Sequence, residues 1–231
     1  MNIGAFESCT LLDYPGKIAC IVYTVGCNFR CKYCYNPDII SDENFKASGR
    51  KLIPEEEILD YIQKHMDMLD AVCITGGEPT MQSDLLEFCQ KIKNLNKLVK
   101  IDTNGGHPER LQACISAGVV DFIAMDIKGP INRYSEITGF VNLPAIKESI
   151  MIVKNSGIPH EFRLTLYPEL KKEDIIDTIS LAPGDLIYLQ QFEPEHAYSA
   201  GAREMKPINK EVINEIVEET KHIADVRIRG F

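Results

Sequence analysis

Cys27, Cys31 and Cys34 crowd into eight residues and are the clearest potential metal ligands of the sequence. Thiolates at spacings of four and three positions can wrap a compact metal centre. A four-iron, four-sulfur cluster has four irons to ligate, so three cysteines leave one iron open. An open metal position is a catalytic feature, as it is at zinc sites. The triplet therefore predicts a cluster with a free coordination position.

A zinc knuckle is the structural alternative to this cluster. It needs a fourth ligand from elsewhere in the chain, for which Cys9, His65 and His107 are candidates. The cysteine spacing alone leaves both kinds of site open. The aromatic Tyr33 before the last cysteine and the glycine pair at 76–77 favour the cluster.

The other cysteines are too dispersed to form a good second cluster. Cys20 and Cys73 lie in apolar, strand-like segments, whereas Cys89 and Cys114 lie in helix-like segments. Free cysteines in such places behave as small hydrophobic residues. We therefore expect these four to be buried in the core and the protein to hold a single cluster.

The chain around the triplet alternates short apolar segments with amphipathic ones. The apolar segments resemble strands, and the amphipathic ones carry apolar residues at helical spacing. The pattern predicts six strands, at 17–25, 70–75, 98–102, 122–126, 160–166 and 186–191, and six helices, at 54–65, 82–94, 108–117, 142–156, 171–181 and 208–224.

Alternating strands and helices with right-handed crossovers form a parallel sheet, either open and doubly wound or curled into a barrel. A complete eight-unit barrel needs about 250 residues. Six units in 231 residues therefore predict an α/β fold, a partial (β/α)6 TIM-like barrel, with one domain over residues 1–231.

Four of the predicted strands end in chemically rich segments. The carboxyl ends of parallel strands share one face, where such folds bind ligands and carry out catalysis. We therefore expect one site rather than four. The segments are Gly26-Cys27, Gly76-Gly77-Glu78-Pro79, Thr103-Asn104-Gly105 and Asp126-Ile127-Lys128.

Composition limits the partners and the location. The formal net charge is −9, with 34 acidic residues against 25 Lys and Arg, which disfavours a broad nucleic-acid-binding surface. The longest apolar stretches are far shorter than the roughly 20 residues that cross a bilayer, and no export signal is recognisable. We expect a cytoplasmic protein that binds neither membrane nor nucleic acid.

Two motifs in this order resemble the radical S-adenosylmethionine (SAM) enzymes: C-x3-C-x-aromatic-C, and G-G-E-P some forty residues later. The resemblance implies a partial barrel of the radical SAM type and a [4Fe-4S] cluster whose open iron is chelated by the amino and carboxylate groups of SAM. Reductive cleavage of SAM would then give methionine and a 5'-deoxyadenosyl radical, which abstracts hydrogen from a substrate.

A narrower resemblance extends over the whole chain. The segments L-D-Y-P-G-K at 12–17, Thr24 to Pro37, G-G-E-P, D-T-N-G and D-I-K resemble glycyl-radical-enzyme activating proteins, most closely the anaerobic ribonucleoside-triphosphate reductase subgroup. This implies that the substrate is a glycine in a partner enzyme. It also implies a reduced flavodoxin or ferredoxin type electron donor.

The strand ends can be matched to the groups of SAM. Gly76 and Gly77 lack side chains, so backbone carbonyls can approach its ammonium, and Glu78 can hold the loop or add an acceptor. The remaining candidates are Asp102 and Asn104 for the ribose hydroxyls, Lys128 for the carboxylate with Asp126 beside it, and Arg163 for the carboxylate, a substrate carbonyl or an internal ion pair.

The family resemblance implies further roles and reveals two departures. Cys27, Cys31 and Cys34 are the implied cluster ligands, with Tyr33, Tyr35 and Gly77 as SAM neighbours and the segment from Asp126 to Lys128 as further contacts. The family commonly has His where this chain has Tyr35. Some members also place a His over the adenosine, where this chain offers Gln190, and His196 lies on the next loop.

Two other functions remain open at this point. One is a radical SAM enzyme that acts on a small molecule or a peptide. The other is a non-catalytic iron–sulfur or zinc protein used for electron transfer or scaffolding.

Overall fold

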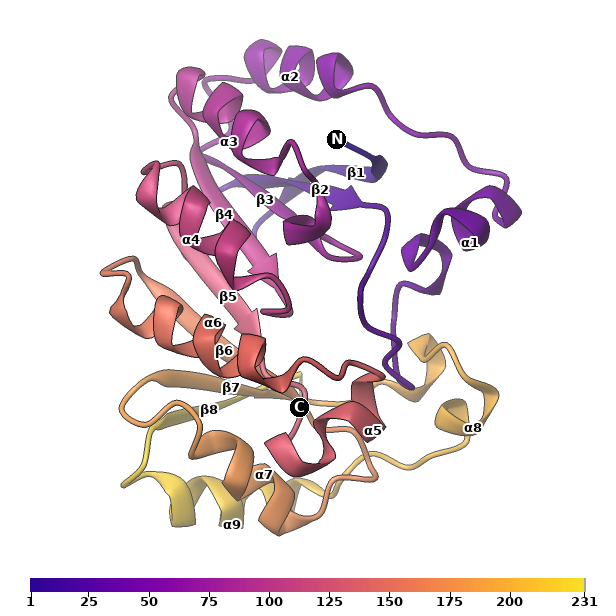
Figure 1. Cartoon of the computed structure of the whole chain (residues 1–231), viewed down its shortest axis with the longest axis vertical. Helices are drawn as coiled ribbons and strands as arrows, with labels where there is room; N and C mark the ends of the chain where they lie inside the picture. The colour runs from indigo at the N-terminus through magenta and orange to yellow at the C-terminus, as the bar shows by residue number, and fades with distance from the viewer. Residues whose placement is uncertain (231) are drawn as a thin grey trace. The chain divides into compact units, whose positions relative to one another are not determined.

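The computed structural model describes residues 1–230, in which eight strands form one sheet. The strands are neighbours in the order of the chain, from β1 to β8 (Figure 1). Their bounds are β1 Ile3–Thr10, β2 Ala19–Thr24, β3 Ala71–Gly76, β4 Leu98–Thr103, β5 Phe122–Asp126, β6 His160–Thr165, β7 Leu186–Gln190 and β8 Asp225–Arg229.

All six strands expected from the sequence are present, as β2 to β7. Strands β1 and β8 were not predicted, because three of the eight residues of β1 are exposed and three of the five residues of β8 are charged. Such polar patterns are typical of strands at the edge of a sheet. β1 pairs with β2 in antiparallel register, whereas the β2–β3, β3–β4, β6–β7 and β7–β8 pairs are parallel.

The helices also follow the expected alternation. Each of the six predicted helices is present, and three short ones were missed because they are too brief to show helical periodicity. The helices are α1 Asp42–Ala47, α2 Glu55–Lys64, α3 Leu85–Asn94, α4 Pro108–Ser116, α5 Tyr134–Thr138, α6 Leu143–Asn155, α7 Lys172–Ile179, α8 Ala200–Arg203 and α9 Lys210–Thr220.

The chain forms two compact units. The N-terminal unit comprises Met1–Asn28 and Asn36–Ala124, and the C-terminal unit comprises Phe29–Tyr35 and the chain from Met125 on. A short segment of the cysteine loop thus belongs to the C-terminal unit, although the residues on both sides of it belong to the N-terminal one.

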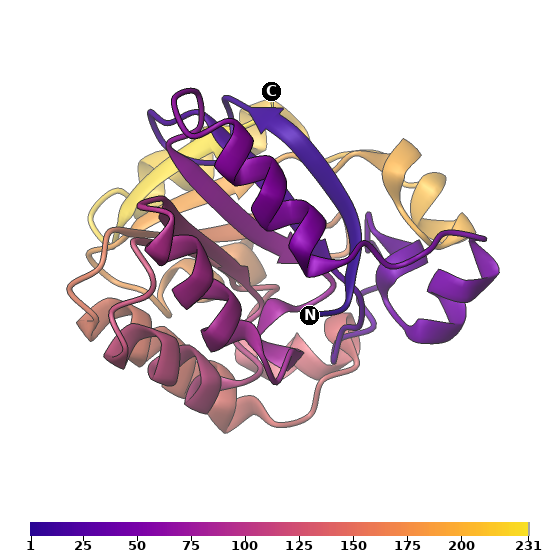
Figure 2. The same ribbon diagram turned by 90° about the horizontal axis from the view of Figure 1, so that it is seen from above.

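The core of the N-terminal unit lies between its strands and α2, α3 and α4, which run along one side of the strands (Figure 1). Ile62, Ile74, Phe88 and Ile101 are fully buried there. The predicted core cysteines Cys20, Cys73, Cys89 and Cys114 are buried as well, which confirms their assignment. Figure 2 shows β1, in indigo, as a long outer strand of this unit.

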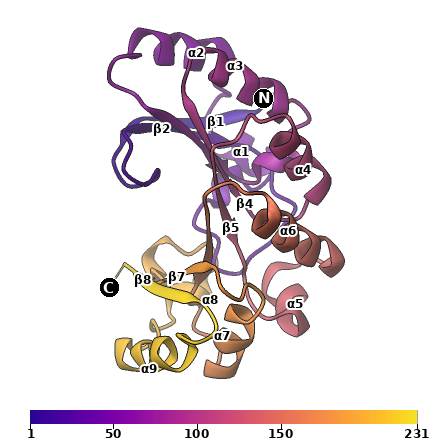
Figure 3. The same cartoon turned by 90° about the vertical axis from the view of Figure 1, so that its left-hand side faces the viewer.

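The C-terminal unit has a sheet with two different faces. Phe162, Leu164, Ile187 and Leu189 are buried on one face of β6 and β7. Helices α7 and α9 lie side by side in this unit (Figure 3), and α9 also contacts β8. Since successive side chains of a strand alternate between faces, Arg163, which pairs in register with Tyr188, lies on the opposite, half-buried face.

No helix within residues 1–230 combines the length and the apolar character that crossing a membrane requires.

The assignment of the N-terminal core can be tested by comparing a buried and an exposed position of α3. Phe88 on α3 has no exposed surface, so Phe88→Ala leaves a cavity and is expected to lower the free energy of unfolding by about 3–5 kcal/mol. Gln90→Ala, at an exposed position of the same helix, should change it by less than about 0.5 kcal/mol. Urea denaturation followed by circular dichroism measures both. A Phe88→Ala protein as stable as Gln90→Ala would contradict the assigned core.

Candidate active site

The three cysteines of the triplet are held by different units. Cys27 belongs to the N-terminal unit, whereas Cys31 and Cys34 belong to the C-terminal unit. All three are partly exposed. Because only seven positions separate the first from the last, the chain itself keeps them close to one another.

The backbone before Cys27 is fixed by the segment that follows the cysteine loop. Gly26 N donates to Ile39 O at 2.8 Å, and Cys27 N donates to Ile40 O at 3.0 Å. Gln82 adds a side-chain bond from Nε2 to Val25 O at 2.9 Å. Gln82 was not recognised from the sequence, because a single Gln after a turn carries no distinctive signal.

The G-G-E-P turn is docked on this same stretch of backbone. Gly77 N donates to Thr24 O at 2.9 Å, and Glu78 N donates to Gly26 O at 2.8 Å. A Cβ atom on Gly77 would lie 2.1 Å from Gly26 O, and one on Gly76 would lie 2.3 Å from Thr24 N. Gly76 also has a φ of +115°, which favours glycine. Both glycines are therefore required for the turn to contact the strand end that leads to Cys27.

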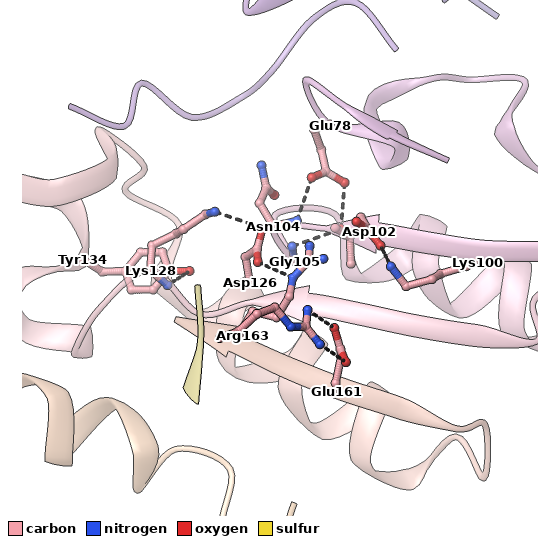
Figure 4. A network of polar contacts seen from close by, with 12 residues as sticks. Glu78, Lys100, Asp102, Asn104, Gly105, Asp126, Lys128, Tyr134, Glu161 and Arg163 are labelled. Atoms are coloured by element: carbon pink, nitrogen blue, oxygen red, sulfur yellow. Dashed lines mark hydrogen bonds and ion pairs between the residues drawn. The ribbon is translucent and has the colours of Figure 1, made fainter. Parts of the chain in front are cut away.

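Glu78 is the buried anchor of this turn, with 1% of its surface exposed. Its carboxylate accepts hydrogen bonds from Thr80 N at 3.1 Å and Thr80 Oγ1 at 2.5 Å. It also accepts from Thr103 Oγ1 and from Asn104 N, both at 2.7 Å (Figure 4). Burial raises the pKa of Glu78, and these four donors oppose the rise. Of its two suggested roles, holding the loop is the one these bonds support.

Asp102 lies in β4 and Asn104 directly follows that strand, but the two side chains have different surroundings. Asp102 forms an ion pair with Lys100, which is almost fully buried on β4. The Asn104 side chain instead donates from Nδ2 to Cys27 Sγ at 3.7 Å and to Asn28 Oδ1 at 2.8 Å. Within the N-terminal unit, the residue that follows β4 therefore contacts Cys27 in the loop that follows β2.

The rest of the cysteine loop is packed against α5 in the C-terminal unit. Arg30 N donates to Thr138 O at 2.6 Å. The buried Phe29 ring contacts Tyr134 edge to face at 6.1 Å and Phe140 at 4.7 Å between ring centroids. This apolar contact fixes the backbone just before Cys31.

The two tyrosines beside Cys34 have distinct contacts. Tyr33 is buried and stacks on Tyr167 with ring centroids 4.9 Å apart. Among the described residues, no group hydrogen-bonds the buried Tyr33 hydroxyl. The Tyr35 hydroxyl accepts a hydrogen bond from Glu193 N at 2.8 Å.

Tyr35, at the position where the family commonly has His, contacts the loop after β7. Its ring lies 6.3 Å from Phe192 and 6.3 Å from His196. Tyr198 N donates to Cys34 O at 2.9 Å as well. The loop after β7 is therefore attached to the cysteine loop at two successive residues, a contact that the sequence pattern did not predict.

Asp126, Lys128 and Arg163 form one charged cluster in the C-terminal unit (Figure 4). Asp126 Oδ1 accepts from Arg163 Nε at 2.8 Å, and Oδ2 accepts from Lys128 Nζ at 2.9 Å. Burial tends to raise the pKa of Asp126, but the two cations outweigh burial and hold this pKa well below its usual range. The internal ion pair suggested for Arg163 is therefore present.

The same lysine acts on the cysteine loop. Burial tends to lower the pKa of Lys128, but the charge of Asp126 and the proximity of Cys31 raise it, so this side chain is a cation. Burial raises the pKa of Cys31 to about 11, and Lys128 opposes that rise. Lys128 therefore places a positive charge where an anionic ligand or thiolate in this unit is stabilised.

Gln190 is the last residue of β7 and pairs in register with Thr165 and Arg229. It shares a strand face with Tyr188, two positions earlier. His196 lies on the short helical turn Pro194–His196 that follows. His196 is thus close to the ring of Tyr35, whereas Gln190 belongs to the sheet.

The residues around the triplet fit an iron–sulfur cluster. The Cys27 sulfur already accepts from an amide, and in each unit a residue next to a cysteine in the sequence has a buried polar atom without a hydrogen-bond partner among residues 1–230: Asn28 Nδ2 and Tyr33 Oη. Buried donors of this kind are rare unless a ligand or water satisfies them. These donors fit an iron–sulfur cluster because its sulfur atoms accept hydrogen bonds.

A single zinc ion fits less well. Within residues 1–230, no three His, Cys, Asp or Glu side chains converge on a point where one ion could bind. A tetrahedral zinc site requires such convergence, whereas in a cubane each cysteine binds a different iron. Cys9, a candidate fourth zinc ligand, is exposed on β1.

A three-cysteine loop after the first parallel strand, followed by a glycine pair docked on it, is the arrangement expected of a radical SAM protein. Comparison with protein families agrees, because residues 21–182 match the model of the Radical SAM superfamily. The chain belongs to this superfamily and is a radical SAM enzyme.

Two curated proteins are similar over most of the chain. One, from Methanocaldococcus jannaschii, carries the provisional name glycyl-radical enzyme activating enzyme; it is 34% identical over an aligned length of 232 residues, and the match covers 94% of this chain and 91% of that protein. The pyruvate formate-lyase-activating enzyme of Listeria monocytogenes is 30% identical over an aligned length of 207 residues, and the match covers 76% of this chain and 80% of that one. The chain is thus homologous to proteins with activase names.

Solved structures share the fold at low sequence identity. SuiB of Streptococcus suis, bound to its precursor peptide SuiA, matches with a TM-score of 0.68 and 13% identity over 91% of this chain and 48% of SuiB, so the chain spans about half of that protein. QueE from Escherichia coli matches with a TM-score of 0.58 and 16% identity over 99% and 93%. The predicted α/β fold of the radical SAM partial-barrel type is confirmed.

The docking of the G-G-E-P turn can be tested by adding one methyl group. Gly77→Ala places a Cβ against Gly26 O and is expected to lower the free energy of unfolding by about 1–3 kcal/mol. Gly201→Ala, where a Cβ meets no atom within 4 Å, should leave it unchanged or raise it by up to about 1 kcal/mol. Urea denaturation measures both. Equal stability of the two variants would show that the turn is not held against Gly26.

The charged cluster predicts a pH dependence. A lowered folded-state pKa means that ionised Asp126 stabilises the folded protein above the ordinary Asp value near 3.9, and that this stability is lost as the pH falls through the lowered pKa. Asp126→Asn should therefore cost about 2 kcal/mol at pH 7 and progressively less below about pH 4.

The matched control for this variant is Asp225→Asn, which breaks an exposed pair with Arg227. Such pairs contribute little to stability, so thermal unfolding from pH 3 to pH 8 should resemble that of the unmodified chain. A constant deficit for Asp126→Asn across this range would contradict the ion-pair account.

Proposed function

We propose that this chain, as one radical SAM domain over residues 1–231, is a glycyl-radical-enzyme activase. The observation that carries the proposal is the cysteine loop fixed at Cys27 by the glycine turn and Asn104, and before Cys31 by the bond of Arg30 N to Thr138 O on α5. Similarity to activase-named proteins over 91% and 80% of their lengths supports the proposed substrate class.

In this proposal Cys27, Cys31 and Cys34 would each ligate one iron of a [4Fe-4S] cluster, leaving one iron for SAM. Once reduced, the cluster would supply the electron for the cleavage of SAM to methionine and, after hydrogen transfer from the substrate, 5'-deoxyadenosine. The chain has to hold SAM at the open iron, keep its reacting end shielded from water, and admit the substrate.

The N-terminal unit supplies the neutral part of the SAM site. The backbone of Gly76 and Gly77 can approach the SAM ammonium, because neither residue carries a side chain in the way. Glu78 keeps that backbone in place through its four hydrogen bonds. Asp102 is the candidate for the ribose hydroxyls, and Asn104 for a group nearer the cluster.

The C-terminal unit supplies the charged part. Lys128 is the candidate for the SAM carboxylate. Asp126 holds the Lys128 ammonium in position, and Arg163 in turn holds the Asp126 carboxylate. Tyr33 and Tyr35 are proposed SAM neighbours, with Gln190 on β7 directed at the adenosine. A point charge such as Lys128 suits a carboxylate that also binds a metal.

The proposed substrate is the α-carbon of a glycine in a partner enzyme. One hydrogen atom leaves this carbon and one electron arrives from a reduced flavodoxin or ferredoxin, which balances the cleavage of one SAM. The motif resemblance described above favours anaerobic ribonucleoside-triphosphate reductase as the partner. An enzyme acting on a small molecule or peptide is the second candidate, and the likeness to peptide-bound SuiB is the observation that favours it.

The proposal is tested by anaerobic reconstitution with iron and sulfide, followed by reduction and addition of SAM. With purified anaerobic ribonucleoside-triphosphate reductase, or pyruvate formate-lyase in parallel, a glycyl-radical EPR doublet should appear together with one 5'-deoxyadenosine per radical. Cys31→Ala should abolish both signals, because it removes a cluster ligand. Cys9→Ala changes an exposed cysteine outside the loop and should preserve both.

The outcomes separate the alternatives. SAM cleavage without a glycyl radical in any partner would exclude the activase and leave the small-molecule or peptide substrate. No SAM cleavage at all would contradict the enzyme assignment. Loss of the cluster in Cys9→Ala would show that a fourth cysteine ligates the metal.

A further inference from the structure

The side chain of Asn104 is fully committed within the N-terminal unit. Its carbonyl Oδ1 accepts from Gly106 N at 2.8 Å. Its amide nitrogen donates to Asn28 Oδ1 at 2.8 Å and to Cys27 Sγ at 3.7 Å. A primary amide has two N–H groups, so one is directed at Asn28 and the other at the sulfur.

The backbone of Asn104 is held just as firmly. Its N–H donates to the buried carboxylate of Glu78 at 2.7 Å, and Thr103 Oγ1 donates to the same carboxylate at 2.7 Å. Thr103 Oγ1 also accepts from Gly105 N at 3.1 Å. The amide is therefore oriented toward Cys27 from both its backbone and its side chain.

A second amide lies behind the first. Asn28 Nδ2 is buried and has no hydrogen-bond partner among residues 1–230. It fits only because position 106 is glycine, since a Cβ there would lie 2.0 Å from Asn28 Nδ2 and 3.0 Å from Asn104 Oδ1. An unpaired buried donor beside Cys27 indicates an acceptor that belongs there.

Donors of this kind change the electron affinity of an iron–sulfur cluster. Reduction adds a negative charge that spreads over the sulfur atoms, so an N–H donor stabilises the reduced form more than the oxidised form. Hydrogen bonds to the sulfurs are among the terms that set cluster potentials. Groups that contact metal ligands in this way typically influence affinity or activity by 10-fold or more.

We infer that Asn104 is a positioning residue for the cluster, which donates to the Cys27 sulfur and, with Asn28 behind it, makes the cluster easier to reduce. The inference rests on the cluster of the proposed function but not on its glycine substrate. It also gives Asn104 a different task from the ribose contact expected from the sequence, because its amide groups are already engaged.

The test is an EPR-monitored redox titration of protein reconstituted anaerobically with iron and sulfide, without SAM. Asn104→Leu removes the donor at similar size, and Asn104→Asp keeps the acceptor for Gly106 N but adds a negative charge. At a fixed potential, Asn104→Leu should lower the ratio of reduced to oxidised cluster about tenfold, which is ~59 mV for one electron. Asn104→Asp should lower it further.

The controls are Asn94→Leu and Asn94→Asp, which make the same changes at an exposed position of α3 and should titrate like the unmodified chain. Two loaded Asn104 variants with unchanged potential and unchanged EPR g-values would overturn the inference. Failure of both to load iron, with normal far-UV circular dichroism, would also overturn it, since Asn104 would then be needed to hold the cluster. Failure of the unmodified chain to load iron would instead contradict the proposed function.

Discussion

The structure of the N-terminal unit depends on one buried carboxylate. Glu78 collects hydrogen bonds from Thr80, Thr103 and Asn104, and so joins the turn after β3 to the turn after β4. A buried carboxylate is costly unless its oxygens are satisfied. Without it, the backbone of Gly77 and the amide of Asn104 would lose their common support beside Cys27. The groups beside Cys27 are therefore positioned by a residue that is itself almost fully buried.

In the C-terminal unit, charged side chains rather than neutral donors lie near the cysteine loop. Asp126 sits between Lys128 and Arg163, and Lys128 acts in turn on Cys31. A lysine ammonium on a flexible chain is an imprecise ligand by itself. The carboxylate fixes the ammonium, which makes a positive charge of defined position. Neutral donors near Cys27 and a fixed cation near Cys31 are thus complementary means of stabilising negative charge on the same loop.

Sequence patterns predicted the fold class, the six strands β2 to β7 and the burial of Cys20, Cys73, Cys89 and Cys114, because periodicity and apolar content decide these features. They could not predict β8, whose charged residues conceal a strand, or β1, in which only three of eight residues are buried. The cysteine loop and its neighbouring strand ends were recognisable from spacing. The contacts of Asn28 and Tyr35 were not, since a hydrogen bond between residues 76 or 158 positions apart exists only in the folded chain.

The central claim is that the cysteine loop holds a cluster with one iron open to SAM. Mössbauer spectroscopy of protein reconstituted with 57Fe tests it directly, before and after SAM is added. The account predicts that about a quarter of the iron signal, from the one iron without a cysteine ligand, shifts when SAM binds. Four irons that remain equivalent in the presence of saturating SAM would contradict it.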